Sequence, residues 1–276
     1  FARLRFMEGG QVRGQWHWPL RLLVIRPSEM DSPENGPVRV EEREGLIRIS
    51  AGETEVVFNK SRASLVSLAR KGKEYLAPDE PVATPQLTAY RAYTDNDRGF
   101  GNWLADDWRD HRLNRLKRVV ESVAVDTAGA RPGLQSRVRY ESAKGGYFLT
   151  TGWRFAADGT LSVTFHFEPF GELPPLPRIG VDWALAPEFD QLSWLGHGPH
   201  ENYSDRLQSA PLGVWSGSVA GQYVPYPRPQ ATGNREGVRW IALRNHQGSG
   251  LLFRSDARPV SATALPFSTA DLDSAT

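Results

Sequence analysis

The chain has 276 residues, with 33 basic and 32 acidic side chains and therefore a formal net charge of +1. A balance this close to zero argues against general binding of nucleic acids, which requires a surplus of positive charge. The chain has no cysteine, which excludes disulfides, thiolate zinc sites and a cysteine nucleophile. Its longest apolar run, LRLLVI near Leu20, is far shorter than the roughly 20 residues of a membrane-spanning helix, so no membrane segment is predicted.

The beginning of the chain divides by composition. Residues 1–26 hold two strands at most, too few for a core of their own, and we interpret them as the remnant of a preceding domain. No charged-then-apolar signal pattern opens the chain, and we expect a cytoplasmic protein. Residues 27–37 contain three prolines and a glycine without apolar periodicity, which is typical of a linker. Residues 38–276 form one domain, which we expect to be truncated at its C-terminus because the chain stops directly after a polar stretch.

Alternating apolar and polar residues dominate this domain, as expected for strands with one buried face. Asp158-Gly159 supplies the positive φ of a tight hairpin. One stretch differs: residues 102–111 predict a short amphipathic helix with Trp103 and Trp108 near one face. Many short strands, 26 glycines and 20 prolines favour an all-β fold, a large antiparallel β-sandwich, over a βαβ fold. Strands are predicted at 45–50, 55–59, 64–68, 136–140, 147–155, 161–167, 179–185, 191–195, 238–244 and 250–255.

The densest polar cluster is TDNDRG, residues 94–99. The oxygen-bearing side chains of Asp95, Asn96 and Asp97, next to the flexible Gly99, are suited to a hard cation or to sugar hydroxyls. The spacing lacks the alternating acids and the distal glutamate of an EF-hand loop, so calcium binding of that type is not predicted. The structural alternative is a turn rich in Asp and Asn that caps the following helix.

The second cluster is GHGPHENYSDR, residues 196–206. His197, His200 and Glu201 are zinc-ligand types, but the Gly-Pro pair between the histidines forbids a helix, so the spacing has no metalloprotease meaning. A histidine with Glu201 is chemically able to act as an acid–base pair. The structural alternative is a loop in which Asn202 and Asp205 hold backbone groups and Arg206 pairs an acid. The motif residues of this loop are His200, Glu201, Asn202, Asp205 and Arg206.

The third cluster is YVPYPRPQ, residues 223–230, followed by the Gly233-Asn234-Arg235 tripeptide. Aromatic rings beside amide and guanidinium donors suit sugar faces and hydroxyls. A rigid polyproline crossing between strands is an equally good interpretation. The sequence has no P-loop, dinucleotide glycine motif or Gly-x-Ser-x-Gly elbow. A glycosidase needs two carboxylates across a cleft, and the sequence by itself does not pair them.

These three segments, in this order, resemble the C-terminal region of the large family 2 β-galactosidases. Residues 91–99, RAYTDNDRG, are similar to that family's R-A-P-T-D-N-D-x-G segment. Residues 194–206, WLGHGPHENYSDR, are similar to its G-x-G-P-x-E-N-Y-x-D-R motif, and residues 225–235, PYPRPQATGNR, to its P-Y-x-x-P-Q-E-x-G-N-R loop. The similarity runs from around Val38 to the end, and residues 15–20 resemble the last strand of the preceding immunoglobulin-like domain.

The resemblance implies a super-sandwich, related in fold to galactose mutarotase, that packs against a catalytic β/α barrel. The complete enzyme would hydrolyse terminal β-D-galactosides with retention, using two glutamates of a barrel that is absent from this chain. No catalytic residue is therefore assigned here, and the isolated segment is expected to be inactive. Asp95, Asn96, Asp97 and Gly99 would shape the mouth of the active site. The implied partners are the β-galactoside, the upstream barrel and further copies in a homo-oligomer, without nucleic acid or membrane.

The sequence also departs from the family pattern, because Tyr93 replaces a proline and Ala231 replaces a glutamate. The chain ends before the family's G-G-D-D-S-W segment, whose tryptophan belongs to the substrate platform. The resemblance points to Mg²⁺ and Na⁺ in the complete enzyme, while no cofactor is assigned to this segment and its metal content is left open. In some relatives, backbone carbonyls near the positions of Arg228, Pro229 and Leu272 line a sodium site.

Three other functions remain open from the residues. A mutarotase-like epimerase would use His197 or His200 with Glu201 and would speed the equilibration of α- and β-galactose. A carbohydrate-binding module would use the aromatic loops and bind oligosaccharides saturably. A scaffold between domains or subunits would do neither.

Overall fold

The computed structural model describes residues 2–8, 11–18, 37–78, 84–99, 103–127 and 131–274. Their strands pair only in antiparallel fashion, which confirms the predicted all-β sandwich fold. Two compact units are present. The first holds the described residues among 1–31, 188–226 and 232–266, and the second holds those among 32–187, 227–231 and 267–276. The boundaries predicted for the N-terminal remnant and the main domain stay predictions, and linker residues 27–36 lie outside the described residues.

The second unit contains a five-stranded sheet in which each strand pairs with the next one along the chain. Its buried face follows the alternation of the sequence. Ile47 and Ile49 are buried, while the neighbouring Leu46 and Arg48 are exposed. The strands are β3 (Arg39–Arg43), β4 (Leu46–Ala51), β5 (Thr54–Asn59), β6 (Ser64–Arg70) and β7 (Lys73–Glu74).

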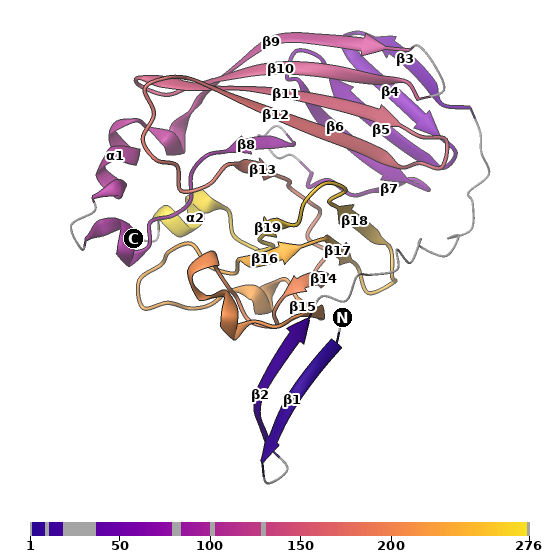
Figure 1. Ribbon diagram of the computed structural model, residues 1–276. Coiled ribbons are helices and arrows are strands. Elements are labelled where there is room, and N and C mark those ends of the chain that lie inside the picture. Colours follow the sequence, from indigo (N-terminus) through magenta and orange to yellow (C-terminus); the bar gives the residue numbers. More distant parts are fainter. Residues whose placement is uncertain are drawn as a thin grey trace. The chain divides into compact units, whose positions relative to one another are not determined.

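A four-stranded sheet forms the other layer of this unit, and the two sheets lie face to face (Figure 1). The rings of Phe58 and Trp153, one from each sheet, meet edge to face with centroids 6.1 Å apart, so the core lies between the layers. Gly159 has a φ of +80°, which confirms the predicted tight turn. The strand order is β12 (Leu161–Gly171), β11 (Gly145–Phe155), β10 (Gly133–Glu141) and β9 (Lys117–Asp126).

Shorter elements complete the second unit. Strands β8 (Gln86–Thr88) and β13 (Gly180–Asp182) pair with each other. The helices are α1 (Leu104–Asp110) and α2 (Thr269–Ser274), with 3₁₀ turns η1 (Asp95–Arg98) and η2 (Leu113–Arg115).

The predicted helix is present, but the placement of its tryptophans was wrong. Trp103 is 62% exposed at the helix beginning, whereas Trp108 is 1% exposed in the core. Five positions rotate by about 140° along an α-helix, so these two side chains cannot share one face. Helix α1 therefore buries a single tryptophan, together with Ala105.

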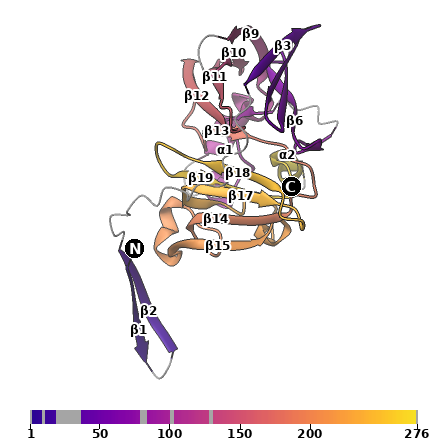
Figure 2. The same cartoon turned by 90° about the vertical axis from the view of Figure 1, so that its right-hand side faces the viewer.

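The first unit is built on a four-stranded sheet in the order β15-β14-β17-β18 (Figure 2). Its core is centred on Leu192, Trp194 and Val238. The strands are β14 (Gln191–His197), β15 (Leu212–Ser218), β17 (Trp240–Arg244) and β18 (Gly250–Arg254). Two further pairs are β16 (Arg235–Val238) with β19 (Val260–Ala262), and β1 (Ala2–Glu8) with β2 (Gln11–Trp18). Turns η3 (Ser204–Ser209) and η4 (Ala220–Gln222) precede and follow β15.

The predicted strands are present, with different ends, but the longest strand that the pattern missed is β9. This strand has no buried residue, and its register against β10 shifts between Arg137 and Val138. A register shift moves the following side chains to the other face of the strand. The alternation in β9 is therefore interrupted, and four of its ten residues are charged.

Candidate functional site

The first polar cluster folds as a short 3₁₀ turn held by a single aspartate. The Asp97 carboxylate is buried and accepts two hydrogen bonds from the Arg91 guanidinium, at 2.5 and 2.9 Å. It also accepts hydrogen bonds from the backbone N–H and the hydroxyl of Thr94, both at 2.7 Å. Burial alone would raise the pKa of Asp97, but the hydrogen bonds from Arg91 and Thr94 outweigh it and hold the pKa below its ordinary value. Asp97 is therefore a fixed, charged anchor.

The other predicted residues of this loop take no part in the hydrogen bonds of Asp97. Asp95 and Asn96 are exposed, and the Asp95 side chain retains 65% of its accessible surface. Its nearest cation is the Nη1 atom of Arg228, 4.0 Å away. Gly99 has an extended backbone with open space around its Cα, so no steric constraint requires glycine there. The turn thus separates one buried aspartate from two polar side chains that face solvent.

Two stacked aromatic rings, one before and one after this turn in the sequence, pack beside it. Tyr93, which immediately precedes the loop, stacks on the buried Trp108 with centroids 6.0 Å apart and planes 12° from parallel. The Arg98 guanidinium lies over the Tyr93 ring at 5.4 Å, and that of Arg91 lies over Trp108 at 5.3 Å. The Trp108 Nε1–H donates to the carbonyl of Pro175 at 2.7 Å, which fixes the lower ring. The loop therefore rests on a packed aromatic base.

The second and third clusters meet at Glu201, which is 6% exposed. Its Oε1 accepts hydrogen bonds from Arg206 Nη2 at 2.5 Å and from the Tyr226 hydroxyl. Its Oε2 accepts hydrogen bonds from the Gly233 N–H at 2.8 Å and the Thr232 hydroxyl at 3.1 Å. Burial would raise the pKa of Glu201, but the four donors outweigh it and lower the pKa. Such a carboxylate is a poor proton donor or acceptor.

Asn202, with no exposed surface, ties the same two segments together through the backbone. Its N–H donates to the Asn234 carbonyl at 2.9 Å, and its carbonyl accepts from the Asn234 side-chain amide at 2.8 Å. Its side-chain oxygen accepts the Glu236 N–H at 2.8 Å. The adjacent Arg235 is buried, with its guanidinium over the Trp194 ring at 5.0 Å.

The remaining residues of the second cluster do not join this network. The Nδ1–H of His197 donates to the Ala210 carbonyl at 2.6 Å, and the exposed His200 has its Nε2 atom 3.3 Å from the Ser209 hydroxyl. Within the described chain, no hydrogen bond links Glu201 to either histidine. Asp205 is exposed and accepts no hydrogen bond from described residues, so its expected role in holding the backbone was wrong.

The hydrogen bonds of Glu201, Asn202 and Arg206 fit the structural interpretation of the second cluster. The motif strings contained their partners, but the sequence did not assign roles to Arg91, Tyr226, Thr232 and Gly233. Each of these partners is separated in the chain from the acid that it contacts, by six residues for Arg91 and by 25 to 32 residues for the others.

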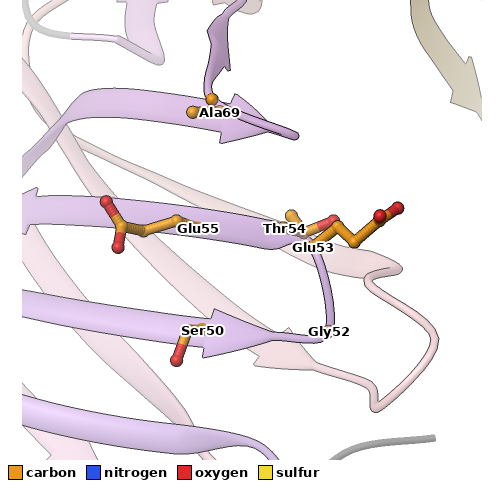
Figure 3. Close-up of a pocket in the computed structure, with 7 residues that line it drawn as sticks. Ser50, Gly52, Glu53, Thr54, Glu55 and Ala69 are labelled. Atoms are coloured by element: carbon orange, nitrogen blue, oxygen red, sulfur yellow. The ribbon is translucent and has the colours of Figure 1, made fainter. Parts of the chain in front are cut away.

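One shallow cavity of about 270 Å³ lies in the second unit at the turn between β4 and β5. Figure 3 shows the side chains of Glu53 and Glu55 extending from this turn in opposite directions. They do not form the facing carboxylate pair that glycoside hydrolysis requires. Both are also paired, Glu53 with Lys71 and Glu55 with Arg48.

Two negative findings for the described residues concern metal ions and membranes. No group of three or more histidine, aspartate or glutamate side chains converges there to hold a metal ion. None of the helices in the described ranges has the length and apolar character needed to cross a bilayer. A site made of backbone carbonyls, as implied near Arg228, Pro229 and Leu272, stays a prediction.

Comparison with known proteins places these motifs. The family model for the beta galactosidase small chain matches residues 50–276, which include all three clusters. The beta-galactosidase of Lactobacillus delbrueckii subsp. bulgaricus is 34% identical over 245 residues, which cover 88% of this chain and 23% of that protein. The beta-galactosidase of Streptococcus thermophilus is 29% identical over 271 residues, covering 96% of this chain and 24% of that protein.

A third relative, the beta-galactosidase of Arthrobacter sp. (strain B7), is 35% identical over 198 residues, covering 64% of this chain and 19% of that protein. The chain thus spans less than a quarter of the length of each of these relatives. Since the family model matches more than three quarters of the sequence and spans every motif described above, this chain belongs to the beta galactosidase small chain family.

Proposed function

We propose that the chain is the C-terminal part of a β-galactosidase that hydrolyses terminal β-D-galactosides with retention. In this proposal the segment shapes the mouth of the active site and supports a catalytic barrel outside the chain. The names of the relatives support the activity, and the resemblance supplies retention and the barrel. The observation that supports this role is the loop at residues 94–99. Its buried Asp97 is held by hydrogen bonds, and its Asp95 and Asn96 side chains are exposed.

The geometry of this loop suits the recognition of a neutral sugar. Four hydrogen bonds hold Asp97, so the turn is ordered before any ligand arrives. Asp95 offers carboxylate acceptors and Asn96 offers both an amide donor and an acceptor, which matches the hydroxyl groups of galactose. Ordered polar groups bind with a smaller loss of conformational entropy than mobile ones. We therefore assign the contacts with sugar hydroxyls to Asp95 and Asn96, and the positioning of both to Asp97.

The second cluster supports a structural role for this segment and a catalytic role for the barrel. An epimerase mechanism needs Glu201, with a histidine, to exchange a proton with the sugar, and this carboxylate is occupied by four donors instead. Its buried network joins the loop at 201–206 to the segment at 226–233, which is a structural task. We infer that the segment contributes architecture and loop contacts, that the catalytic carboxylates lie elsewhere in the enzyme, and that the isolated segment does not turn over galactosides.

Complementation tests this proposal. The purified chain is mixed with the separately expressed upstream portion, barrel included, and a chromogenic β-galactoside is assayed. A chain extended past Thr276 with the family's G-G-D-D-S-W segment is run in parallel. We expect activity only after mixing, with the extended chain at least as effective. A double variant, Asp95→Ala with Asn96→Ala, should lower kcat/KM, whereas Asp256→Asn, which changes an exposed acid paired with Arg254, should not.

Turnover by the isolated chain would contradict the assignment of catalysis to the barrel. Failure of the extended chain to restore activity would contradict the proposed function as a whole. Binding of Mg²⁺ and Na⁺, assembly into a homo-oligomer and a cytoplasmic location are further proposals, which rest on the resemblance and the sequence. Metal analysis and sedimentation of the reconstituted enzyme check the first two of them.

A further inference from the structure

Arginines at the polar loop differ in how their charges are balanced. Arg98, the last residue of η1, makes no ion pair and no hydrogen bond within the described chain; its one specific contact is the Tyr93 ring. Three other arginines contact the loop or the rings beneath it, and each has one carboxylate partner: Arg91 with Asp97 at 2.5 Å, Arg109 with Asp106 at 3.0 Å, and Arg228 with Asp95 at 4.0 Å.

The side chain of Arg98 is nevertheless held in place. Its guanidinium lies 5.4 Å from the centroid of Tyr93, and this ring stacks on the buried Trp108. A cation over an aromatic face is attracted by the ring quadrupole while its N–H groups remain available at the edges. Arg98 is half-buried, so the charge is partly shielded from solvent but still accessible. The result is an oriented positive charge without a carboxylate partner.

Tyr93 and Arg98 occupy positions that the family pattern does not share with this chain. Tyr93 takes the place of the proline in the R-A-P-T-D-N-D-x-G pattern, and Arg98 occupies the variable position of that pattern. A proline offers no aromatic ring, so a sequence with proline at position 93 could not hold an arginine in this way. The contact between Tyr93 and Arg98 therefore adds a feature that the shared motif does not contain.

We propose that Arg98 is a specificity-determining residue that recognises an anionic oxygen group, a carboxylate or a phosphate, on the non-galactosyl part of the substrate, with Tyr93 as its positioning residue. This inference rests on the proposed function, because it requires the loop to lie at the active-site mouth. The galactosyl group is uncharged, so an unbalanced cation can discriminate only through the other part of a galactoside. A guanidinium binds carboxylates and phosphates through two parallel N–H bonds.

The test uses the complete enzyme and three substrates: an uncharged nitrophenyl β-D-galactoside, one whose ring carries a carboxylate, and a galactoside whose second sugar carries a phosphate. For each substrate, kcat/KM of the variant is divided by that of the wild type, so differences in leaving-group reactivity cancel. Arg98→Gln should lower the ratio by roughly three- to tenfold for at least one charged substrate. This range lies between the effects of an exposed ion pair and of a charge-assisted hydrogen bond. The loss should appear mainly as a higher KM. The uncharged substrate should change by less than twofold, and the charged substrate with the larger loss identifies the anion.

Matched variants separate charge recognition from loop structure. Arg109→Gln removes the other guanidinium over Tyr93, 6.0 Å from its ring, and should leave all three ratios unchanged because that charge is already paired. Tyr93→Phe keeps the ring and should behave as the wild type, whereas Tyr93→Pro should reproduce the loss seen in Arg98→Gln. Higher salt should diminish the preference for the charged substrate.

Two outcomes would overturn the inference while leaving the proposed function intact. An equal loss for charged and uncharged substrates in Arg98→Gln would show that Arg98 serves only the loop structure. No loss for any substrate would show that Arg98 does not contact the substrate. By contrast, a wild-type complete enzyme that hydrolyses none of the galactosides would refute the proposed function itself.

Discussion

Replacing Glu201 by glutamine is the sharpest test of the network that joins the second and third clusters. The substitution keeps the shape of the side chain and removes its charge. Whichever way the new amide is oriented, its NH₂ group faces two of the four donors that Glu201 now accepts. In either orientation one of these two donors is a hydroxyl, of Tyr226 or Thr232, which can turn to accept from the amide. The other, the Arg206 guanidinium or the Gly233 N–H, is left facing a donor.

The expected cost follows from the geometry. A buried donor left without an acceptor costs about 1–3 kcal/mol. The Arg206 side chain is 47% exposed and can recover hydration, which places the expected loss in the lower part of this range, about 1–2 kcal/mol. For a domain of this size, about 2–4 °C of melting temperature corresponds to each kcal/mol, so Glu201→Gln should lower the melting temperature by about 2–8 °C.

Differential scanning calorimetry of the 276-residue chain measures this loss. Glu53→Gln is the matched control, because Glu53 is 56% exposed and its partner Lys71 lies 3.2 Å away at the surface. That control should cost less than about 1 kcal/mol. Equal shifts for Glu201→Gln and Glu53→Gln would refute the reasoning, since they would mean that the buried donors do not depend on the Glu201 carboxylate.

The same carboxylate predicts a pH dependence. Its folded pKa lies below its ordinary value, so the unfolded chain binds more protons in the acid range. The stabilisation from Glu201 is therefore fully present above the unfolded pKa and is lost as the pH falls through the folded pKa. Between neutral pH and pH 3, the melting temperature of Glu201→Gln should consequently fall less than that of the wild type. A parallel fall in both proteins would contradict this assignment.

Two further predictions concern local structure. Asp97→Asn should destabilise the chain by about 2–4 kcal/mol in urea unfolding, because the paired hydrogen bonds with Arg91 lose their charge and one acceptor becomes a donor; an unchanged midpoint would contradict the anchoring role. Gly159→Ala should cost about 1–2 kcal/mol, because φ is +80° and the new Cβ would lie 2.6 Å from the Thr54 hydroxyl oxygen. Gly180→Ala, whose nearest contact is an ordinary 3.8 Å, is its control and should shift the melting temperature by less than half as much.

The sheets were predictable where the signal is local. The alternation of apolar and polar residues in β4, and the Asp158-Gly159 turn between β11 and β12, depend on neighbouring residues and were confirmed. Strand β9 was missed because its register shift lies in the pairing with β10, which no property of β9 by itself reveals. The two tryptophans near α1 were misplaced because their spacing was judged without the rotation of the helix.

The candidate site shows the same division. Three ordered motifs with unusual polar and glycine content identify the family from the residues alone, and with it the segments that matter. The sequence did not distinguish Asp95 from Asp97, which have the same side chain two positions apart. Only the tertiary structure decided that one is exposed and the other is buried against Arg91.

Glu201 was open to two interpretations for the same reason. Its neighbours His200 and Asn202 are local, but the donors from Tyr226, Thr232 and Gly233 arrive from 25 to 32 residues farther along the chain. Turns and strand faces depend on neighbouring residues, so they could be predicted from the sequence. Burial, charge pairing and pKa depend on groups that only folding brings within hydrogen-bonding distance, so the surroundings of Asp97, Glu201 and Arg98 follow from the tertiary structure.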